Sequence, residues 1–514
     1  MIDDSSRLEV ALSVHSSDTT VQALENDRSQ GRINLLIDGQ WTPATSDQVT
    51  TVIDPASENV LAQVADASVA DVDAAVTAAR VARTSWARVS PAQRTKLLWQ
   101  LADLIERDGE HLSVLEVLNQ GKPLELAQAL DVQGSAETLR YYAGWSTKLH
   151  GVTSHISADD PRPIGSLGVA HHAFSTQEPV GVVAAIVPWN VPLVMAVAKL
   201  GPALTAGCTV VLKPAPETPL TTLRLGQLIL EAGFPPGVVN IITGGGDVGV
   251  ALVNHPGVDK IAFTGSTPTG RAIAATAGQQ LKRVTLELGG KSPLIVFNDA
   301  DLESAAQAAA WSIFLNAGQM CFATSRLLIQ RDVYAEVLDR VCLLAGELTL
   351  GSGLDSSVGL GPVISARQQD RVMRYIESAI EAGADVRTGG ARVAGRGFFV
   401  EPTVIASPGL KAKIMREEVF GPVLCAAAFD DDAEAVRLAN DTEYGLAASL
   451  WTQNLSRAHT VASVIEAGTV WVNCNVVLDE SMPFAGWKQS GLGSEGGRAG
   501  VEEYLQHRSV VIAL

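Results

Sequence analysis

The sequence contains few cysteines, and they are far apart. Only five occur among 514 residues, and none belongs to a CxxC pair or to a Cys/His spacing typical of metal sites. This pattern indicates neither a disulfide framework nor a zinc site, so a cysteine with a chemical role is expected to act alone as a thiol. The five are Cys208, Cys321, Cys342, Cys425 and Cys474.

Basic charge and long apolar runs are also scarce. The chain carries 38 Lys and Arg against 56 Asp and Glu, a formal net charge of −18. DNA and anionic lipid would repel such a chain, so we expect no nucleic-acid and no membrane partner, and small-molecule chemistry is favoured. No apolar run reaches the roughly 18–20 residues that span a bilayer, and the first residues lack a basic or apolar signal. These features predict a cytoplasmic enzyme.

The length predicts two or three domains, at roughly 100–200 residues each. Residues 1–30 are polar and lack a sustained period, which indicates a loose leader outside the first core. Asp38-Gly39 then stands between two apolar runs, where a type I′ turn would close a β-hairpin. Ser68 can cap a helix over Asp71–Arg83, and Ser90-Pro91 can begin one that includes Lys96–Arg107.

After Pro179 the sequence pattern changes to short apolar strands that alternate with helical stretches. This alternation predicts parallel strands with crossover helices. The predicted strands are Val182–Val187, Thr209–Leu212, Val238–Thr243, Lys260–Phe263 and Val284–Leu286. A second alternation starts at Pro293 and runs through Arg326–Gln330 to Trp471–Asn473, which implies a second α/β domain. The seam between the two domains is the expected place for a site.

Two segments fit neither domain. Thr153–Ser175 is one, and the tail from His507 to Leu514, which has the composition of a strand, is the other. Exposed strands of this kind invite pairing with another subunit.

Three segments carry candidate chemistry. Cys321 lies among small and amide residues that allow close backbone approach, although a lone cysteine can equally be an inert core residue. Glu287 ends an apolar strand beside a glycine pair, and its alternative role is to pair with Lys291. Asn190 follows a buried strand between two prolines, where ligands collect in open α/β sheets; the alternative is a turn asparagine.

Together these segments resemble the aldehyde dehydrogenase superfamily. Its signatures are a Leu-Glu-Leu-Gly-Gly-Lys stretch, a Gly-Gln-x-Cys stretch 34 residues after that glutamate, and an upstream Pro-Trp-Asn element, all present here around Glu287, Cys321 and Asn190. The resemblance extends from about Asn34 to the end of the chain. Further ordered matches are Lys213-Pro214, the segment from Phe263 to Thr267, the segment from Glu417 to Pro422, and the segment from Pro483 to Gly491.

The resemblance implies an NAD(P)-dependent enzyme that oxidises an aldehyde to a carboxylic acid. Cys321 would be the nucleophile, and it needs activation because a thiol with a pKa of about 8.5 is only a few per cent thiolate at pH 7. The Asn190 amide and the Cys321 N–H would hold the oxyanion, at about 3–4 kcal/mol per donor. Glu287 would be the general base that hydrolyses the thioester, and relatives that pass the acyl group to coenzyme A typically lack it.

The resemblance also implies the cofactor NAD, with NADP as the alternative. Lys213 would bind ribose hydroxyls, Glu418 would accept from the nicotinamide ribose with Phe420 packed nearby, and Ser266 would help to bind the pyrophosphate at a helix N-terminus. The other reading of Ser266 is a simple helix cap. The remaining positions implied for the cofactor site are Ile186, Pro188, Trp189, Phe263, Gly265, Leu288 and Gly289.

Two features bear on how the cofactor would bind. Gly244-Gly-Gly246-Asp-Val-Gly249 satisfies the GxGxxG pattern, but in this superfamily the phosphates lie elsewhere, so these glycines can equally form a tight turn. Many NAD-preferring relatives carry a glutamate three residues after the lysine, whereas here that position is Pro216 and Glu217 follows. A Glu217 carboxylate that reaches the 2′-hydroxyl favours NAD, and one that points away admits NADP.

The positions expected to line the aldehyde passage are small or apolar. Val191, Met195 and Ala198 stand where relatives often have large aromatics, and no arginine in these segments could bind a second carboxylate. An apolar aldehyde, aromatic or medium-chain, is therefore favoured over a semialdehyde of a dicarboxylic acid. The other lining positions are Phe322, Leu478 and Phe484.

The expected fold class is α/β, with a Rossmann-like parallel-sheet cofactor-binding domain, a second α/β catalytic domain and a small β oligomerisation arm. The first comprises residues 31–152 and 177–287, the second residues 288–480, and the arm residues 153–176 and 497–514. Two other functions stay open: a cysteine-dependent esterase, and a catalytically silent structural or binding member of the same fold. The intact cofactor positions argue against the esterase, and the presence of both Cys321 and Glu287 argues against the silent protein.

The arm predicts self-association as a homodimer or homotetramer. Deleting residues 510–514 removes most of the strand-like tail and should weaken assembly, because the tail is expected to pair across subunits. Size-exclusion chromatography checks this, and an unchanged elution volume would count against it.

Overall fold

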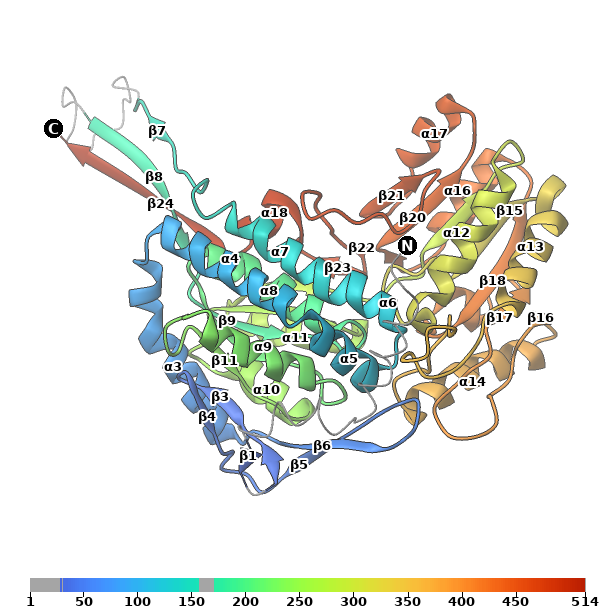
Figure 1. Cartoon of the computed structure of the whole chain (residues 1–514). Helices are drawn as coiled ribbons and strands as arrows, with labels where there is room; N and C mark the ends of the chain where they lie inside the picture. Colours follow the sequence, from blue (N-terminus) through green and yellow to red (C-terminus); the bar gives the residue numbers. More distant parts are fainter. Residues whose placement is uncertain (1–27, 30, 157–170, 514) are drawn as a thin grey trace, which may run out of the picture.

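A computed structural model describes residues 28–29, 31–156 and 171–513 and shows two sheet-based bodies with an arm that projects from one of them (Figure 1). The predicted leader lies almost wholly outside the described residues. The predicted hairpin is confirmed, since β3 (Leu35–Ile37) and β4 (Gln40–Thr42) pair antiparallel. Asp38 and Gly39 join them with φ of 53° and 73°, the left-handed values that a type I′ turn requires.

Eight strands form the first sheet, in the order β23-β13-β12-β9-β10-β11-β3-β4. The five predicted strands are its parallel centre, and they are fully buried except for the first two residues of β13. Burial on both faces explains their continuous apolar runs. Their bounds are β9 Val182–Ile186, β10 Thr209–Lys213, β11 Val239–Ile241, β12 Lys260–Thr264 and β13 Arg283–Glu287.

Helices cover both faces of this sheet (Figure 1). The crossover helices are α8 (Pro192–Ala206), α9 (Leu220–Glu231), α10 (Gly246–Asn254) and α11 (Thr267–Gln279). The amino-terminal helices are α3 (Val69–Ala87), α4 (Pro91–Arg107), α5 (Gly109–Gln120), α6 (Leu124–Leu126), the π-helix η2 (Ala127–Gln133) and α7 (Gly134–Ala143).

Both predicted caps are confirmed. Ser68 accepts a hydrogen bond from Asp71 N at 3.2 Å while the Asp71 carboxylate accepts from Ser68 N at 2.8 Å, which is a capping box. Ser90 caps α4, which has proline at its first position. The helix after Ser68 begins at Val69, two residues before its predicted range, and the helix after Ser90 begins at Pro91, as predicted.

Seven strands form the second sheet, in the order β16-β17-β18-β15-β14-β20-β21. All are parallel except β16 at the edge. Their bounds are β14 Pro293–Val296, β15 Arg326–Gln330, β16 Asp385–Thr388, β17 Thr403–Ala406, β18 Val423–Phe429, β20 Ala447–Trp451 and β21 Thr469–Val472. The helices α12 (Leu302–Phe314), α13 (Tyr334–Gly346), α14 (Ala366–Glu381), α16 (Asp432–Asn440) and α17 (Leu455–Ala462) flank it. The predicted second α/β domain is confirmed.

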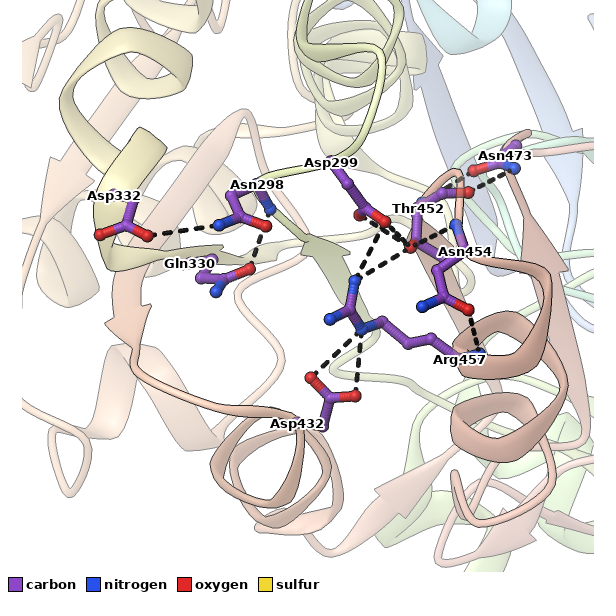
Figure 2. A network of polar contacts seen from close by, with 9 residues as sticks. All are labelled: Asn298, Asp299, Gln330, Asp332, Asp432, Thr452, Asn454, Arg457 and Asn473. Atoms are coloured by element: carbon purple, nitrogen blue, oxygen red, sulfur yellow. Dashed lines mark hydrogen bonds and ion pairs between the residues drawn. The ribbon is translucent and has the colours of Figure 1, made fainter.

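A polar network occupies the carboxyl edge of the second sheet (Figure 2). Arg457, from α17, binds Asp299 at 3.1 Å and Asp432 at 3.0 Å. Its guanidinium lies over the Phe297 ring, 4.6 Å from the centroid. Because this edge pairs its own charged groups with one another, the first sheet is the one whose carboxyl edge is left to bind ligands.

The chain end crosses between the bodies before it forms the arm. β23 (Gly491–Leu492) adds an antiparallel strand to the first sheet beside β13. β24 (Leu505–Ala513) then pairs along its whole length with β8 (His171–Pro179), which also pairs with β7 (Thr153–Ser154). The predicted tail strand is confirmed, but its pairing here is within the chain.

Two boundaries differ from the sequence ranges. Residues 497–502, assigned to the arm, form α18 (Gly497–Glu502), which packs on α8 in the first body. The strand β8 extends to Pro179, so the arm reaches beyond residue 176. None of the helices in the described part of the chain is long and apolar enough to cross a membrane.

Candidate active site

The three predicted catalytic residues come together at the seam of the two bodies. Glu287 is the last residue of β13, and Asn190 follows the end of β9, so both stand at the carboxyl edge of the first sheet. The Glu287 carboxyl lies beside the Cys321 thiol, which comes from the second domain, and each group shifts the pKa of the other. The Asn190 amide Nδ2 donates to the Gln319 carbonyl at 2.8 Å, two residues before the thiol.

A tight loop presents Cys321. It starts with the 3₁₀ helix η3 (Leu315–Gly318), in which Asn316 and Ala317 have left-handed φ of 50° and 53°. This conformation costs non-glycine residues roughly 1–2 kcal/mol each. Gly318 follows with φ 71°, and a Cβ there would lie 2.0 Å from the Gly421 carbonyl oxygen.

Side-chain amides hold the loop in this conformation. Asn316 Nδ2 donates to the Asn190 carbonyl at 2.9 Å. Gln319 Nε2 donates to the Asn316 carbonyl at 3.0 Å, and Gln319 Oε1 accepts from Ile364 N at 2.9 Å. These buried hydrogen bonds offset the backbone strain. The sequence showed the amides around the thiol but not what they bind.

The glycine pair after Glu287 allows two close approaches. A Cβ on Gly289 would lie 2.4 Å from Glu418 Oε2, and one on Gly290 would lie 2.5 Å from the Cys321 carbonyl oxygen. Any larger residue at either position would push the nucleophile or the Glu418 carboxylate away. The pair therefore makes room for the Glu418 carboxylate and for the Cys321 backbone, whereas the sequence had suggested space around Glu287 itself.

Glu287 is held in a state suited to proton transfer. It is 5 % exposed, and burial raises its pKa to about 8, with the charge of Glu495 adding to the rise and that of Lys199 opposing it. Its Oε1 has no hydrogen-bond partner. The alternative that Glu287 merely pairs with Lys291 is wrong, because the Lys291 ammonium is buried without any hydrogen-bond partner.

The surroundings of Cys321 disfavour its thiolate form. Cys321 is partly exposed, but desolvation of the thiol raises its pKa well above the ordinary value, and the adjacent Glu287 raises it further. Thiolate formation therefore requires a change in the local charge, such as loss of the Glu287 charge or arrival of a cation. All five cysteines are free.

Lys199 and Glu495, whose charges act on Glu287, were not identified from the sequence. Lys199, on α8, is fully buried and hydrogen-bonded to Glu495. A lysine inside an otherwise apolar helical stretch was a usable signal. Glu495 lies in a polar loop near the chain end, and nothing in the sequence linked it to Glu287.

The cofactor candidates line the same edge of the first sheet. Lys213 ends β10, is 4 % exposed, and donates to the Pro214 carbonyl at 3.2 Å. Burial lowers its pKa to about 8, and the nearby Glu217 charge opposes that shift. The Glu217 carboxylate also binds Arg367 at 3.0 Å. A buried ammonium with only one neutral acceptor fits a site for ribose hydroxyls.

On the other side of the seam, Glu418 accepts from Gly290 N at 3.1 Å, and burial raises the pKa of its carboxyl to about 7. Phe420 has φ 59°, and its ring meets Trp189 edge to face, with the centroids 5.2 Å apart. Glu418 and Phe420 thus approach the Pro-Trp-Asn element from the second domain.

Glycines shape the remaining cofactor positions. A Cβ on Gly265 would lie 2.5 Å from the Phe263 ring, and one on Gly270 would lie 2.4 Å from Leu288. Gly246 begins α10 with open space around it, so a phosphate could approach that helix N-terminus. Ser266 caps α11 by accepting from Thr269 N at 3.5 Å, as its simpler reading predicted. Ile186 and Pro188 lead from the end of β9 to Trp189. These residues fit a dinucleotide.

The predicted substrate positions differ in how far they are exposed to solvent. Val191 and Phe322 are buried, and the Phe322 ring lies edge-on to Trp471 at 6.3 Å. The other positions are more open: Met195, Ala198 and Phe484 are half-buried, and Leu478 is 48 % exposed.

Comparison with known proteins identifies the class. The sequence matches the aldehyde dehydrogenase family over residues 41–510, so the chain belongs to that family. The predicted family, the α/β fold and the enzyme class, an NAD(P)-dependent aldehyde dehydrogenase, are confirmed.

Individual relatives resemble the chain over nearly its whole length. It is 48 % identical to a phenylacetaldehyde dehydrogenase of Pseudomonas fluorescens, over 93 % of this chain and 95 % of that one. It is 43 % identical to retinal dehydrogenase 2 of Gallus gallus, over 93 % and 92 %. An NAD⁺ complex of a Bacillus cereus aldehyde dehydrogenase has a TM-score of 0.92 at 44 % identity and covers 96 % of this chain and 98 % of that one.

The contact between Glu287 and Cys321 predicts how the free thiol titrates. Above a pH of about 8 the Glu287 carboxyl is ionised and opposes loss of the thiol proton. Glu287→Gln removes that charge, so the pH at which Cys321 reaches half of its maximal alkylation rate by iodoacetamide should fall. Mass spectrometry of the labelled peptide measures this rate, with Cys321→Ser as the control. A rise in that pH would mean that Glu287 promotes ionisation.

Proposed function

We propose that this enzyme oxidises an apolar aldehyde to its carboxylic acid with NAD as the hydride acceptor. The carrying observation is the proximity of the Glu287 carboxyl to the Cys321 thiol where the two domains meet, with the Asn190 amide hydrogen-bonded to the same loop. A nucleophile, a base and an oxyanion donor within one water-poor site suit acyl chemistry.

The chain's residues account for the first half of the reaction. The Cys321 thiol first loses its proton to solvent, and the resulting thiolate attacks the aldehyde carbon, so that the carbonyl oxygen becomes negative. The Cys321 N–H and the second hydrogen of Asn190 Nδ2, whose first goes to Gln319, would stabilise that oxygen. The cofactor, when bound, accepts the hydride that leaves the tetrahedral carbon. A thioester on Cys321 then remains.

Hydrolysis completes the cycle. Glu287 takes a proton from a water molecule, the resulting hydroxide attacks the thioester carbon, and the thiolate leaves as the acid is released. A base with a pKa of about 8 is matched to neutral operating conditions, because it is both strong enough to accept the proton and able to release it.

The proposed residues for NAD lie on both domains. Lys213 and Glu217 would hold the adenosine end, Gly246 and Ser266 the phosphates, and Glu418 the nicotinamide ribose. Support comes from the buried, nearly unsatisfied Lys213 ammonium and from the Bacillus cereus relative, whose structure is an NAD⁺ complex.

We propose an aromatic aldehyde as the substrate class. Val191, Phe322 and Trp471 give the passage an apolar wall. Two similar proteins are named for phenylacetaldehyde and retinal, both apolar aldehydes.

We also propose a homodimer or homotetramer assembled through the arm, whose exposed Val511 and Ile512 offer apolar surface.

Ester hydrolysis and a silent structural role explain less of the site. Neither needs the buried Lys213, and burying an unused charge costs several kcal/mol.

The function is tested by recording the absorbance of reduced cofactor with phenylacetaldehyde, retinal and a dicarboxylic semialdehyde. Apolar aldehydes should have at least about tenfold higher kcat/KM than the charged one, since an unpaired carboxylate would enter an apolar passage. Cys321→Ser should abolish the signal. Glu287→Gln should give a burst of about one reduced cofactor per site and then a slow phase, because the thioester accumulates. Signal without the thiol, or none with any aldehyde, contradicts the proposal.

Cofactor choice is tested at Glu217. Its carboxylate would repel the 2′-phosphate of NADP, so Glu217→Gln should raise kcat/KM for NADP by about tenfold, equivalent to about 1.4 kcal/mol. Arg367→Met is the matched variant, since it removes the ion-pair partner but keeps the carboxylate, and it should lower the use of NADP. Equal kcat/KM for NADP in the wild type and both variants would show that Glu217 and Arg367 do not distinguish NAD from NADP.

A further inference from the structure

Helix α8 begins at Pro192, two residues after Asn190, and its first turn lacks a local cap. The N-cap residue is Val191, which has no side chain that could accept a hydrogen bond. Proline has no N–H, so the amides of Leu193 and Val194 are the first-turn donors that need acceptors. Val191 is 4 % exposed and packs in the core of the second domain, where a polar cap would be costly.

Two carboxyl groups from distant segments stand where a cap would be. Glu116 Oε1, on α5, accepts from Leu193 N at 2.9 Å. The Asp131 carboxyl, on η2, lies near the Val194 amide. Both acids are fully buried. Negative charge at a helix N-terminus is favourable, so the pair replaces the cap that Val191 cannot provide.

The charges in this cluster imply a shared proton. Lys122 Nζ binds Asp131 Oδ2 at 2.5 Å and is 1 % exposed, so two acids face one cation. Glu116 and Asp131 lie close enough to influence each other's ionisation, and two ionised carboxylates cannot donate a hydrogen bond to each other. Burial, followed by the charge of Asp131, raises the pKa of Glu116. A proton carried by Glu116 would satisfy both otherwise unpartnered oxygens, Glu116 Oε2 and Asp131 Oδ1.

The same cluster reaches the nucleophile loop. Gly121, beside Lys122, has φ 98°, and a Cβ there would lie 2.8 Å from Pro362. The Pro362 carbonyl accepts from Gln319 Nε2 at 3.5 Å. One side of the cluster therefore holds the helix that follows Asn190, and the other contacts the loop that carries Cys321.

We propose that Glu116 and Asp131 share one proton and act as positioning residues that fix the first turn of α8, and thereby hold Asn190 at the oxyanion position. This inference rests on the proposed function, because it takes Asn190 to be the oxyanion donor. Lys122 balances the remaining negative charge. If the cluster only stabilised the fold, any equally stable cluster could replace it. If it positions Asn190, its effect on catalysis must act through Asn190 alone.

A double-mutant cycle separates the two roles. Asn190→Ala should lower kcat by about 10²- to 10³-fold, as expected for loss of one oxyanion donor. Glu116→Ala should lower kcat by about tenfold to hundredfold through misplacement of that donor, with the dissociation constant for NAD unchanged. The double variant should be about as slow as Asn190→Ala, because Glu116 then has nothing left to position.

Two further variants keep the test independent of folding. Glu116→Gln can still accept from Leu193 N and can donate to Asp131, as the protonated acid does, so it should retain most of kcat. Thr205→Val is the matched control on the same helix: its buried hydroxyl donates to the Tyr142 carbonyl at 2.9 Å, and its loss should lower the melting temperature without lowering kcat.

The outcomes are distinct. If Asn190→Ala leaves kcat unchanged, the oxyanion assignment fails and the positioning proposal fails with it. If Asn190→Ala is slow but Glu116→Ala multiplies that loss, Glu116 acts elsewhere and only the positioning proposal is overturned. A Glu116→Gln protein as slow as Glu116→Ala would overturn the shared proton.

Discussion

The structure depends on one contact, the meeting of the Glu287 carboxyl with the Cys321 thiol across the seam of two domains. Bringing an acid and a thiol into a buried site is unfavourable for their charged forms, and both pKa values rise accordingly. The surrounding backbone is built for this approach. Gly289, Gly290 and Gly318 each stand where a Cβ would collide with the site.

The two sheets share an architecture but differ at their carboxyl edges. In the second sheet, Arg457 joins Asp299 and Asp432, so the polar groups there are paired internally (Figure 2). In the first sheet, Lys213 and Glu287 end their strands with little to bind. Polar groups that are desolvated and left unpaired mark a functional edge, because a purely structural edge would pair them.

Helix α8 links the buried charges of the first domain to the site. Its first turn rests on Glu116 and Asp131, and Lys199, further along, binds Glu495. Burying charged side chains around an apolar helix costs free energy of folding. Such buried charges are expected where they fix a geometry that the reaction needs. Asn190 lies in the short segment between strand β9 and this helix.

The sequence alone determined the family, the two α/β domains, the succession of strands and helices along the chain, and the identity of the three catalytic candidates. It could do so because strand periodicity, turn residues and the spacing of Glu287 and Cys321 are local in the chain. Capped helix starts at Ser68 and Ser90 were predictable for the same reason.

Only the tertiary structure decided which residues surround those candidates. The charged and reactive groups around Glu287 are Cys321, Glu495 and Lys199 rather than Lys291, and the acid that accepts from the Leu193 amide of α8 lies 77 residues upstream. Such long-range pairings leave no periodic trace in a single sequence, since they are fixed by how helices and sheets pack. The pKa values of the site follow from burial and neighbouring charge, which exist only once the two domains meet.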